Sequence, residues 1–541
     1  MKNKFYINRV GYHASADKIA VCTVNGRFFN IIDAQSGASV YEGRLSDPIY
    51  DKESDDTVRI ADFSDFNQHG RFYIKIGIRR SGSFEISDNV FDGVKTDVMN
   101  AIKMSRCGYD TLAHADEFGE ELAPFLTGSA HPDVISHSGK RYDMSGGWHT
   151  MGGFDKDVPA TCIVIAELLY SLTVFPASFD RARKKRLLDE CRWGLDFLLK
   201  MQDSDGGVFS DIHAKTKFTN GSPEEDTDIR LIGEKSCLAC LRFASVTALA
   251  ARTFERSDKA YSHRLSSAAQ MAWIYIVGTS EYKYYQGKYG SLDDDLDGLY
   301  ALESDFMWTM CEMYSLTGGS EFANMIEQKY TSCLFGGFGD RFCGGYASLA
   351  YLLADKPKKD FIVSFIRMRV SFRADRLWIA RCESGYRVSC SAGGGYIYGT
   401  NQRILSNIQQ CQLAYLLTGD TRYLRTATEN LGYIFGCNPI GSAFITANKD
   451  GFCRNPCHRL SSSVYEDICL PGLVVGGANI LRTDPFSKWN IEKNTPPAKC
   501  YIDNKFSYAT NEPSIHYSAP LIFITAFYDE IGRSVFNSLN R

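Results

Sequence analysis

The stretch Gln402-Arg-Ile-Leu-Ser-Asn-Ile-Gln-Gln-Cys-Gln-Leu-Ala-Tyr-Leu-Leu-Thr-Gly419-Asp420 shows how most of this chain is built. Residues 402–418 have the pattern of a helix, and Gly419 suits its end because glycine adopts the left-handed conformation without penalty. Asp420 can begin the next helix by capping it. On its inner face that helix carries Leu424, Ala427, Leu431 and Ile434. The stretch therefore predicts two consecutive helices joined by a tight turn.

The same helical period runs outward from this stretch, from about residue 92 onward. In the segment 183–202 one stripe is formed by Leu188, Cys191, Leu195 and Leu198. About a dozen such segments occupy about 440 residues with few strand signals among them. This count predicts a closed toroid of paired helices, whose loops would build a site at one end.

The first 90 residues have a different pattern, with apolar residues at every second position. Examples are Ile19-x-Val21, Phe29-x-Ile31 and Phe72-x-Ile74-x-Ile76. Turn signals such as Asn25-Gly26 separate these runs. Several short strands at this spacing predict a small β-sandwich over residues 1–90, ahead of a helical domain over residues 91–541.

Length and composition exclude several classes of protein. The chain has 541 residues, of which 44% are hydrophobic and 23% charged, the balance of a folded protein rather than a disordered one. Lys and Arg number 60 against 64 Asp and Glu, so the net charge is −4. That balance excludes the broad basic field used to bind nucleic acids or anionic membranes. Aromatic residues reach 13%, which favours a cleft that stacks flat ligands.

The cysteines and the apolar runs bear on the compartment. The 17 cysteines are scattered and odd in number, and the chain opens Met1-Lys-Asn-Lys-Phe-Tyr-Ile-Asn8, without an apolar signal-peptide core. We therefore expect reduced thiols and a cytoplasmic protein. No run of about 18 apolar residues is present, so no membrane span is expected.

Three segments of the helical part carry a resemblance to a known family. They are Asp143-Met-Ser-Gly-Gly-Trp-His149, then Gly436-Cys-Asn-Pro439 followed by Pro456-Cys-His-Arg459, and finally Thr510-Asn-Glu-Pro-Ser-Ile-His-Tyr-Ser-Ala-Pro520. In this order and spacing they resemble glycoside hydrolase family 9. Val10-Gly-Tyr12 resembles the immunoglobulin-like module that precedes many members. The resemblance implies an immunoglobulin-like β-sandwich followed by an all-α (α/α)6 barrel that cuts β-linked glucans with inversion.

Inverting hydrolysis requires an acid that protonates the leaving oxygen and a base that deprotonates water, about 6.5–9.5 Å apart. Glu512 lies where the family has its general acid, and Asn511, Tyr517 and Pro520 around it also match. The alternative is an ordinary surface Glu near a helix start, where the helix dipole favours it. The match of the flanking residues favours the acid.

The other half of the catalytic pair departs from the family pattern. Where the family has Asp-Ala-Gly-Asp, this chain has Thr150-Met-Gly-Gly153, so both usual base aspartates are absent. Thr150 can still hydrogen-bond a water, but Gly153 has no side chain to accept its proton. Losing a catalytic base typically lowers the rate by about 10²–10⁴.

Three interpretations of this departure remain open. In the first, Asp155 or Asp157 serves as a relocated base, although both also suit the start of the helix that begins near Val158. In the second, the protein is an inverting phosphorylase, in which phosphate is the nucleophile and His458, Arg459 and Lys156 bind the anion. In the third, it is an inactive homologue that binds sugar without cutting it.

The resemblance also implies sugar-binding and metal-binding positions. His458 and Arg459 match a His-His-Arg element at the cleavage point, with Cys457 in place of the first His. Further substrate-binding candidates are Trp148, His149, Tyr398 and Tyr517, with Trp148 either a stacking platform or core. Cys107 and His149 match two ligands of a structural zinc site, and the remaining pair is Val134-Ile135, flanked by His131 and His137. Such sites tolerate shifts poorly, so we expect no metal and no cofactor.

Together these features predict a cytoplasmic carbohydrate-active enzyme that cleaves a small imported β-linked oligosaccharide with Glu512 as acid. The partners expected are this oligosaccharide and, in the phosphorylase alternative, inorganic phosphate. Neither nucleic acid nor membrane is expected as a partner.

Overall fold

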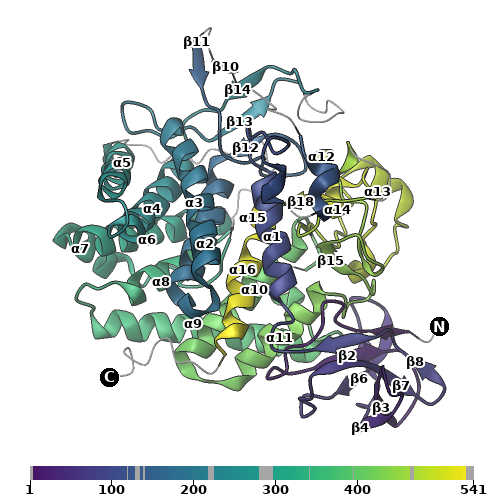
Figure 1. The fold of residues 1–541 in the computed structure, drawn as a ribbon. Coiled ribbons are helices and arrows are strands. Elements are labelled where there is room, and N and C mark those ends of the chain that lie inside the picture. Colours follow the sequence, from purple (N-terminus) through teal and green to yellow (C-terminus); the bar gives the residue numbers. More distant parts are fainter. Residues whose placement is uncertain are drawn as a thin grey trace. The chain divides into compact units, whose positions relative to one another are not determined.

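The computed structural model describes residues 4–118, 120–127, 134–137, 140–216, 225–278, 296–339, 341–393, 395–463 and 468–531 (Figure 1). The chain forms two compact units. Unit 1 comprises residues 1–101 and 374–534, and unit 2 comprises residues 102–373 and 535–541. Unit 1 thus joins the N-terminal strands to the last part of the helical chain. The predicted domain boundary at residue 90 stays a prediction.

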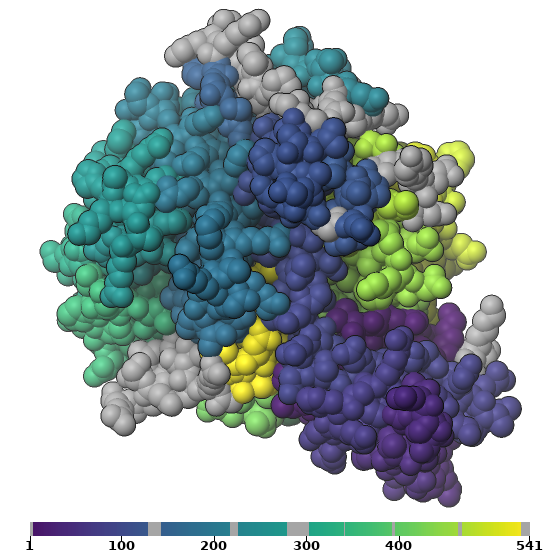
Figure 2. All heavy atoms as spheres, in the orientation of Figure 1, coloured from purple at the N-terminus to yellow at the C-terminus, as the bar shows by residue number. Residues whose placement is uncertain are grey.

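Two antiparallel sheets form the first part of unit 1, the lobe coloured purple in Figure 2. One sheet has the order β1-β2-β6-β5, and the other has the order β4-β3-β7-β8 with β9 paired to β7. Their bounds are β1 Phe5–Tyr6, β2 Ile19–Cys22, β3 Phe28–Asp33, β4 Ser39–Arg44, β5 Ile49–Asp51, β6 Asp56–Asp62, β7 Gly70–Ile76, β8 Arg79–Arg80 and β9 Phe84–Ile86. Phe72, Ile74 and Ile76 are buried in one core with residues of the other sheet, which confirms the predicted alternation and the N-terminal β-domain.

The rest of unit 1 is mainly helical. Its helices are α1 Asp92–Met104, which runs on into unit 2, the last part of α9 Asp360–Glu383, α10 Thr400–Thr418, α11 Thr421–Ile434, α12 Arg459–Ser462, α13 Pro485–Asn490, α14 Tyr508–Asn511, α15 Ile515–Ser518 and α16 Pro520–Asp529. As predicted, α10 ends at Gly419, which has a φ of 73°, and the Asp420 side chain caps α11 by accepting the Arg422 N–H. The local sequence therefore determines this helical pair.

A small sheet in unit 1 is absent from the sequence prediction. It has the order β16-β15-β17-β18, with β15 Ala443–Thr446, β16 Phe452–Cys453, β17 Val474–Val475 and β18 Pro513–Ser514. Its strands are two to four residues long, too short for any period to be visible. The pairing of β17 with β18 holds the segment that follows Glu512.

Unit 2 contains most of the remaining helices. They are α2 Val158–Val174, α3 Arg181–Met201, α4 Cys237–Phe254, α5 Lys259–Gly278, α6 Leu296–Thr317, α7 Ser320–Lys329, α8 Gly344–Leu353 and the first part of α9. In α3 the predicted stripe is buried at Cys191, Leu195 and Leu198, whereas Leu187 is buried in place of the predicted Leu188. Helix α4 is long and apolar enough to span a membrane, but 78% of it is buried inside the protein.

Unit 2 also has a five-stranded sheet of order β11-β10-β14-β13-β12 (Figure 1). The strands are β10 Val134–His137, β11 Lys140–Asp143, β12 Lys156–Asp157, β13 Asp211–Ala214 and β14 Arg230–Ile232. Strands β12 and β13 pair in antiparallel register, with Asp157 opposite Asp211 and Lys156 opposite Ile212. This sheet brings the loop before α2 next to a strand some fifty residues further along the chain, with Ala214 donating its N–H to Asp155 across a sequence separation of 59 residues.

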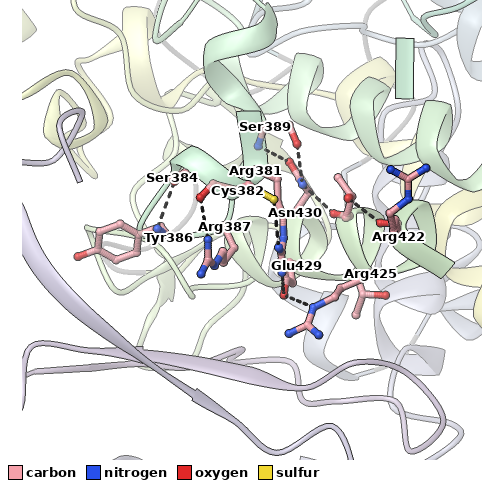
Figure 3. A network of polar contacts seen from close by, with 12 residues as sticks. Arg381, Cys382, Ser384, Tyr386, Arg387, Ser389, Arg422, Arg425, Glu429 and Asn430 are labelled. Atoms are coloured by element: carbon pink, nitrogen blue, oxygen red, sulfur yellow. Dashed lines mark hydrogen bonds and ion pairs between the residues drawn. The ribbon is translucent and has the colours of Figure 1, made fainter. Parts of the chain in front are cut away.

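A buried ionic network links two helices of unit 1 (Figure 3) and reaches its β-domain through Asp62. Arg381 on α9 forms a bidentate pair with Glu429 on α11. Arg425 bonds the same carboxylate at 3.1 Å and also pairs with Asp62 at the end of β6. Glu429 is 3% exposed, so its charge depends on these two guanidinium groups.

We expect Glu429→Ala to lower the free energy of unfolding by about 3–5 kcal/mol, because it leaves Arg381 without its buried partner. Urea unfolding followed by tryptophan fluorescence measures the change. The matched control is Asp189→Ala, which removes an exposed pair with Lys185 at 2.6 Å and should cost less than about 1 kcal/mol. Equal losses in the two variants would contradict the prediction.

Candidate active site

Glu512 lies in unit 1 between α14 and β18, in a segment whose backbone is bonded on both sides. The Gly476 N–H donates to the Glu512 carbonyl at 3.0 Å, and the Gly477 N–H donates to the Thr510 carbonyl at 2.8 Å. Cys457 donates its N–H to the carbonyl of Asn511 at 2.9 Å. The three segments Cys457–Arg459, Gly476–Gly477 and Thr510–Glu512 therefore meet at one place.

Two buried side chains fix this segment from beneath. Asp484 caps α13 and also accepts the Ala509 N–H at 2.8 Å and the Ser507 hydroxyl at 3.1 Å. The Asn511 amide donates to the Asn455 carbonyl at 2.6 Å, and its oxygen accepts the Tyr501 hydroxyl at 2.6 Å. Because both side chains are fully buried and satisfied, the backbone beside Glu512 has little freedom to move.

Tyr398 contacts the predicted acid directly. Its hydroxyl donates to Glu512 Oε2 at 2.9 Å, and the ring is 37% exposed. Three residues further along the chain, the Asn401 amide donates to the Val475 carbonyl at 2.8 Å. The sequence predicted Tyr398 as a sugar contact, and the structure gives it a further role in holding the carboxylate.

Tyr517 approaches the same segment from α15. Between the two tyrosines lies Gly399, which has a φ of 73°. A Cβ at Gly399 would lie 3.2 Å from the Tyr517 hydroxyl oxygen. Glycine is therefore required there both by the backbone and by the close approach of Tyr517. Tyr517 is 7% exposed, so little of its surface is available to a ligand.

The Cys457–Arg459 segment carries less positive charge than a pocket for an anion requires. His458 is buried, its Nδ1 lies 2.9 Å from the Ser461 hydroxyl, and burial lowers its pKa to about 4. Its imidazole is therefore neutral near pH 7. Burial also raises the pKa of Cys457 to about 12, so this thiol stays protonated. Arg459, the first residue of α12, is the one fixed positive charge within this three-residue segment.

In unit 2, the loop that precedes α2 carries the remaining candidates. Trp148 is fully buried, and its indole N–H donates to Glu190 at 2.8 Å. Glu190 in turn forms a bidentate pair with Arg106. A Cβ at Gly194 would lie 2.2 Å from the Trp148 ring, so the ring packs directly against helix α3 at a position that only glycine leaves open. Of the two interpretations of Trp148, the structure supports core and not a stacking platform.

His149 is also largely enclosed. It is 8% exposed, its N–H donates to the Ser105 carbonyl at 2.8 Å, and its ring lies 4.9 Å from that of Phe154. These contacts place His149 in the packing of the loop. A role in binding substrate stays a prediction.

The polar residues after His149 are engaged in the structure of the loop. Thr150 donates its N–H to the Asp155 carbonyl at 3.0 Å, and its hydroxyl accepts the Asp157 N–H at 3.3 Å. Asp157 accepts the Ala160 N–H at 2.7 Å and so caps α2. Asp155 accepts the Ala214 N–H at 2.9 Å. The helix-capping alternative for Asp157 thus agrees with the structure.

Gly153 and Lys156 bear on the open alternatives. A Cβ at Gly153 would meet nothing within 4 Å, so its position faces open space. Lys156 is fully buried, and its ammonium donates to the carbonyls of Met144 at 2.7 Å and Gly146 at 3.0 Å. The phosphorylase alternative, in which Lys156 would bind the anion, is therefore not supported by this ammonium, which is bonded inside the loop.

The described residues do not fit the zinc site that the resemblance implies. The ammonium of Lys156 lies 3.5 Å from Cys107 Sγ, where a zinc ion bonded to that sulfur at about 2.3 Å would meet a like charge. Within the described part of the chain, no three His, Cys, Asp or Glu side chains gather into a metal site. His131 and the side chain of His137, the possible substitutes, lie outside the described residues.

One pair of polar residues was missed by the sequence analysis. His213 Nδ1 lies 2.6 Å from Asp211 Oδ2 on β13. The available signal was their spacing of two residues on a strand, which places both side chains on one face.

Comparison with known proteins decides the family. The model for glycosyl hydrolase family 9 matches residues 91–525, and that for the cellulase N-terminal Ig-like domain matches residues 1–81. The chain belongs to glycosyl hydrolase family 9. It is a glycosidase of the class that hydrolyses β-linked glycans.

Three relatives of this family 9 enzyme are similar to it over nearly their whole length. A cellodextrinase of Butyrivibrio fibrisolvens is 27% identical over 96% of this chain and 98% of its own. A xyloglucan-specific endo-β-1,4-glucanase of Bacteroides ovatus is 27% identical over 97% and 93%. A metagenome-derived family 9 endoglucanase of known structure has a TM-score of 0.86 at 25% identity, covering 98% and 99%. These matches support the N-terminal β-domain followed by a helical domain.

Tyr398→Phe removes the hydrogen bond to Glu512 while keeping the ring. Hydrogen bonds to charged groups contribute about 1.5–3 kcal/mol, so we expect kcat to fall about tenfold or more with a smaller change in KM. Steady-state kinetics on a cello-oligosaccharide measure this. Phe506→Ala, at a ring 63% exposed elsewhere on unit 1, is the control. A change confined to KM would mean that Tyr398 acts only on the sugar.

The lowered pKa of His458 predicts a pH dependence of stability. Between pH 4 and about 6.5 the unfolded chain binds a proton that the native imidazole does not. The neutral His458 imidazole therefore contributes fully to the free energy of unfolding above pH 6.5, and this contribution, about 3 kcal/mol in total, is lost as the pH falls towards 4. We expect the urea midpoint of His458→Gln to vary less with pH over this range than that of His263→Gln, the control at an exposed site. Parallel curves for His458→Gln and wild type would refute the assignment.

Proposed function

We propose that the protein hydrolyses short β-1,4-linked gluco-oligosaccharides with inversion, using Glu512 as the general acid. The observation that carries the proposal is the carboxylate of Glu512, bonded by Tyr398 and mounted on a segment that Asp484 and Asn511 hold rigidly. A carboxyl group held in place can deliver its proton to a leaving glycosidic oxygen without reorganisation. The similarity to a cellodextrinase along the full chain supports the short substrate.

Hydrolysis is favoured over phosphorolysis by the charges near the candidate residues. A phosphate dianion requires several accessible cations. His458 is neutral near pH 7, and the ammonium of Lys156 is buried against backbone carbonyls. Two of the three cations of the phosphorylase alternative, His458 and Lys156, therefore cannot serve as accessible cations for a phosphate. We therefore propose water as the nucleophile.

Two further features belong to the proposal. The first is that the helices close into an (α/α)6 barrel, supported by the packing of successive helices α2 with α3, α4 with α5, α6 with α7 and α10 with α11. The second is a reducing compartment such as the cytoplasm, supported by 17 free thiols, of which only Cys382 is exposed. A cytoplasmic enzyme would receive imported oligosaccharides rather than the polymer.

The atypical motif leaves the proton acceptor unassigned. Thr150 and Gly153 stand where the family aspartates are expected, and we propose that another group of this chain accepts the proton of water. Asp155 and Asp157 carry structural hydrogen bonds that reduce their availability for this step.

Glu512→Gln tests the acid. We expect kcat on cellotetraose to fall by about 10² or more, because the amide cannot protonate the leaving oxygen. On a dinitrophenyl β-cellobioside, whose leaving group needs little protonation, the same variant should lose far less. Glu492→Gln, at an exposed carboxylate of unit 1, is the control. Equal losses on both substrates would exclude Glu512 as the acid.

Product analysis tests the reaction class with the wild-type enzyme. Cello-oligosaccharides are incubated with and without inorganic phosphate, and the products are separated by chromatography. Free sugars in both arms support hydrolysis. Sugar 1-phosphate formed only with phosphate would overturn it in favour of phosphorolysis, and measurable binding without product would support the inactive homologue.

A further inference from the structure

We propose that helix α9 carries a docking surface for a second copy of this chain. The surface, called the α9 stripe below, consists of Phe361, Phe365, Met368 and Phe372, all of which belong to unit 2. It contains none of the residues assigned to catalysis, so the proposal holds whether or not Glu512 is the acid. The expected assembly is a symmetric dimer.

The four side chains of the α9 stripe share one side of the helix. Their spacings of four, three and four residues place them within a sector of about 60° on an ideal α-helix. Phe361, Met368 and Phe372 are 45%, 53% and 58% exposed. Three large apolar side chains thus lie together on the surface of unit 2, and contiguous apolar patches of this kind mark interaction sites.

The other side of the same helix already packs into the core. Ile362, Ile366 and Val370 are fully buried, and they lie about 130° around the helix from the α9 stripe. This part of α9 is therefore apolar on two sides. A helix that is apolar on more than its core-facing side is typically covered on both sides.

Neighbouring rings hold the α9 stripe in a fixed shape. The ring of Phe361 lies 5.4 Å from that of Tyr330, and the ring of Phe365 lies edge-on to the same tyrosine at 5.0 Å. Phe335 also contacts Phe365, with 6.3 Å between the ring centres. A surface that is already ordered loses little side-chain entropy when a partner covers it.

The exposed area suits the centre of a dimer interface. An aromatic side chain has about 150–250 Å² of surface, so the exposed parts of Phe361, Met368 and Phe372 amount to roughly 300 Å² per protomer. A stable dimer buries about 800 Å² per partner, with an apolar centre and a polar rim. The α9 stripe provides the apolar centre, and the surface around it can provide the rim.

The α9 stripe is also complementary to itself. Its spacing is that of the a and d positions of a coiled coil, with Phe365 and Phe372 at a and Phe361 and Met368 at d. Side chains at these positions interlock with the same positions on an identical helix. Because each copy offers the same surface to the other, the contact closes on itself as a dimer and does not extend into a chain.

The polar edges of the α9 stripe determine how the two helices run. Arg369 occupies an e position on one edge, and Ser364 and Ser371 occupy g positions on the other edge. In a parallel pair each e edge faces the g edge of the partner, so each arginine meets serines. An antiparallel pair would bring the two arginine edges together, where like charges repel. The two helices should therefore run parallel.

Sedimentation equilibrium over a range of protein concentrations tests the surface. We expect the wild-type protein to show a monomer–dimer equilibrium. Phe372→Glu should raise the dissociation constant of the dimer about 100-fold or more, because both copies then place a carboxylate in the apolar contact. The matched control is Ile274→Glu, which puts the same charge on α5 of unit 2 at a residue that is 64% exposed and outside the α9 stripe. This control should leave the dissociation constant unchanged.

A cysteine crosslink tests the orientation. In a parallel pair residue 368 of one copy lies against residue 368 of the other, so Met368→Cys should form a disulfide between copies when copper phenanthroline is the oxidant. In an antiparallel pair residue 368 would face residue 365 instead. The experiment uses a Cys382→Ser background, because Cys382 is the exposed thiol of the described chain. Gel electrophoresis without reductant measures the crosslink.

Each result supports the proposal or overturns it. A dimer that Phe372→Glu dissociates and Ile274→Glu preserves supports the α9 stripe. A wild-type protein that is monomeric at every concentration, or a dimer that Phe372→Glu leaves intact, overturns it.

Thermal unfolding shows whether each variant is folded. If Phe372→Glu is not folded, the crosslink of folded Met368→Cys decides, and its absence overturns the proposal. A crosslink that forms only when Met368→Cys is mixed with Phe365→Cys overturns the parallel orientation.

Discussion

The segment that carries Glu512 has little regular structure of its own, so its backbone groups must be satisfied by partners elsewhere in unit 1. A buried N–H or carbonyl left without a partner costs about as much free energy as a lost hydrogen bond. This region has many buried backbone N–H and carbonyl groups that need a partner. Asp484 meets the constraint at the start of α14, and Asn511 meets it at the end. The short strands β17 and β18 and the Cys457 backbone complete it. The position of the carboxylate is thus a by-product of satisfying the backbone around it.

The same constraint explains why the polar residues of the loop before α2 have so little chemical freedom. Without the two aspartates, Thr150, Asp155 and Asp157 still have to bridge a tight turn, a strand pairing and a helix start. Each of them is bonded to main-chain atoms of its neighbours. Lys156 adds an internal positive charge that binds carbonyl groups of the preceding residues. The presence of a carboxylate in this loop therefore does not by itself indicate a catalytic group.

Local signals in the sequence predicted local features well. Gly419 and Asp420 mark a helix end and a helix start because their preferences act within a few residues. Alternation at Phe72, Ile74 and Ile76 likewise needs only the strand itself. The match around Glu512 located the candidate acid. The helical character of the chain after about residue 92 also followed from its period, whereas the division into two units did not.

Features that depend on distant partners were beyond the sequence. Trp148 is core because Glu190, 42 residues further on, accepts its indole N–H. Tyr398 reaches Glu512 across a separation of 114 residues. The pair Asp211–His213 lies beside Lys156 and Asp157 because β12 and β13 pair, and neither strand is long enough to show a period. Such contacts are set by topology, which no run of neighbouring residues encodes.

The distribution of the thiols has a practical consequence for handling the protein. All 17 cysteines lie in the described part of the chain, and Cys382 on α9 is the exposed one among them. Burial holds the pKa values of Cys162, Cys240, Cys437 and Cys469 above their usual range, so these sulfurs are poor nucleophiles as well as inaccessible. A maleimide or iodoacetamide reagent would thus attach a fluorophore or spin label preferentially at a single natural position of unit 1, with no need to remove the other cysteines first.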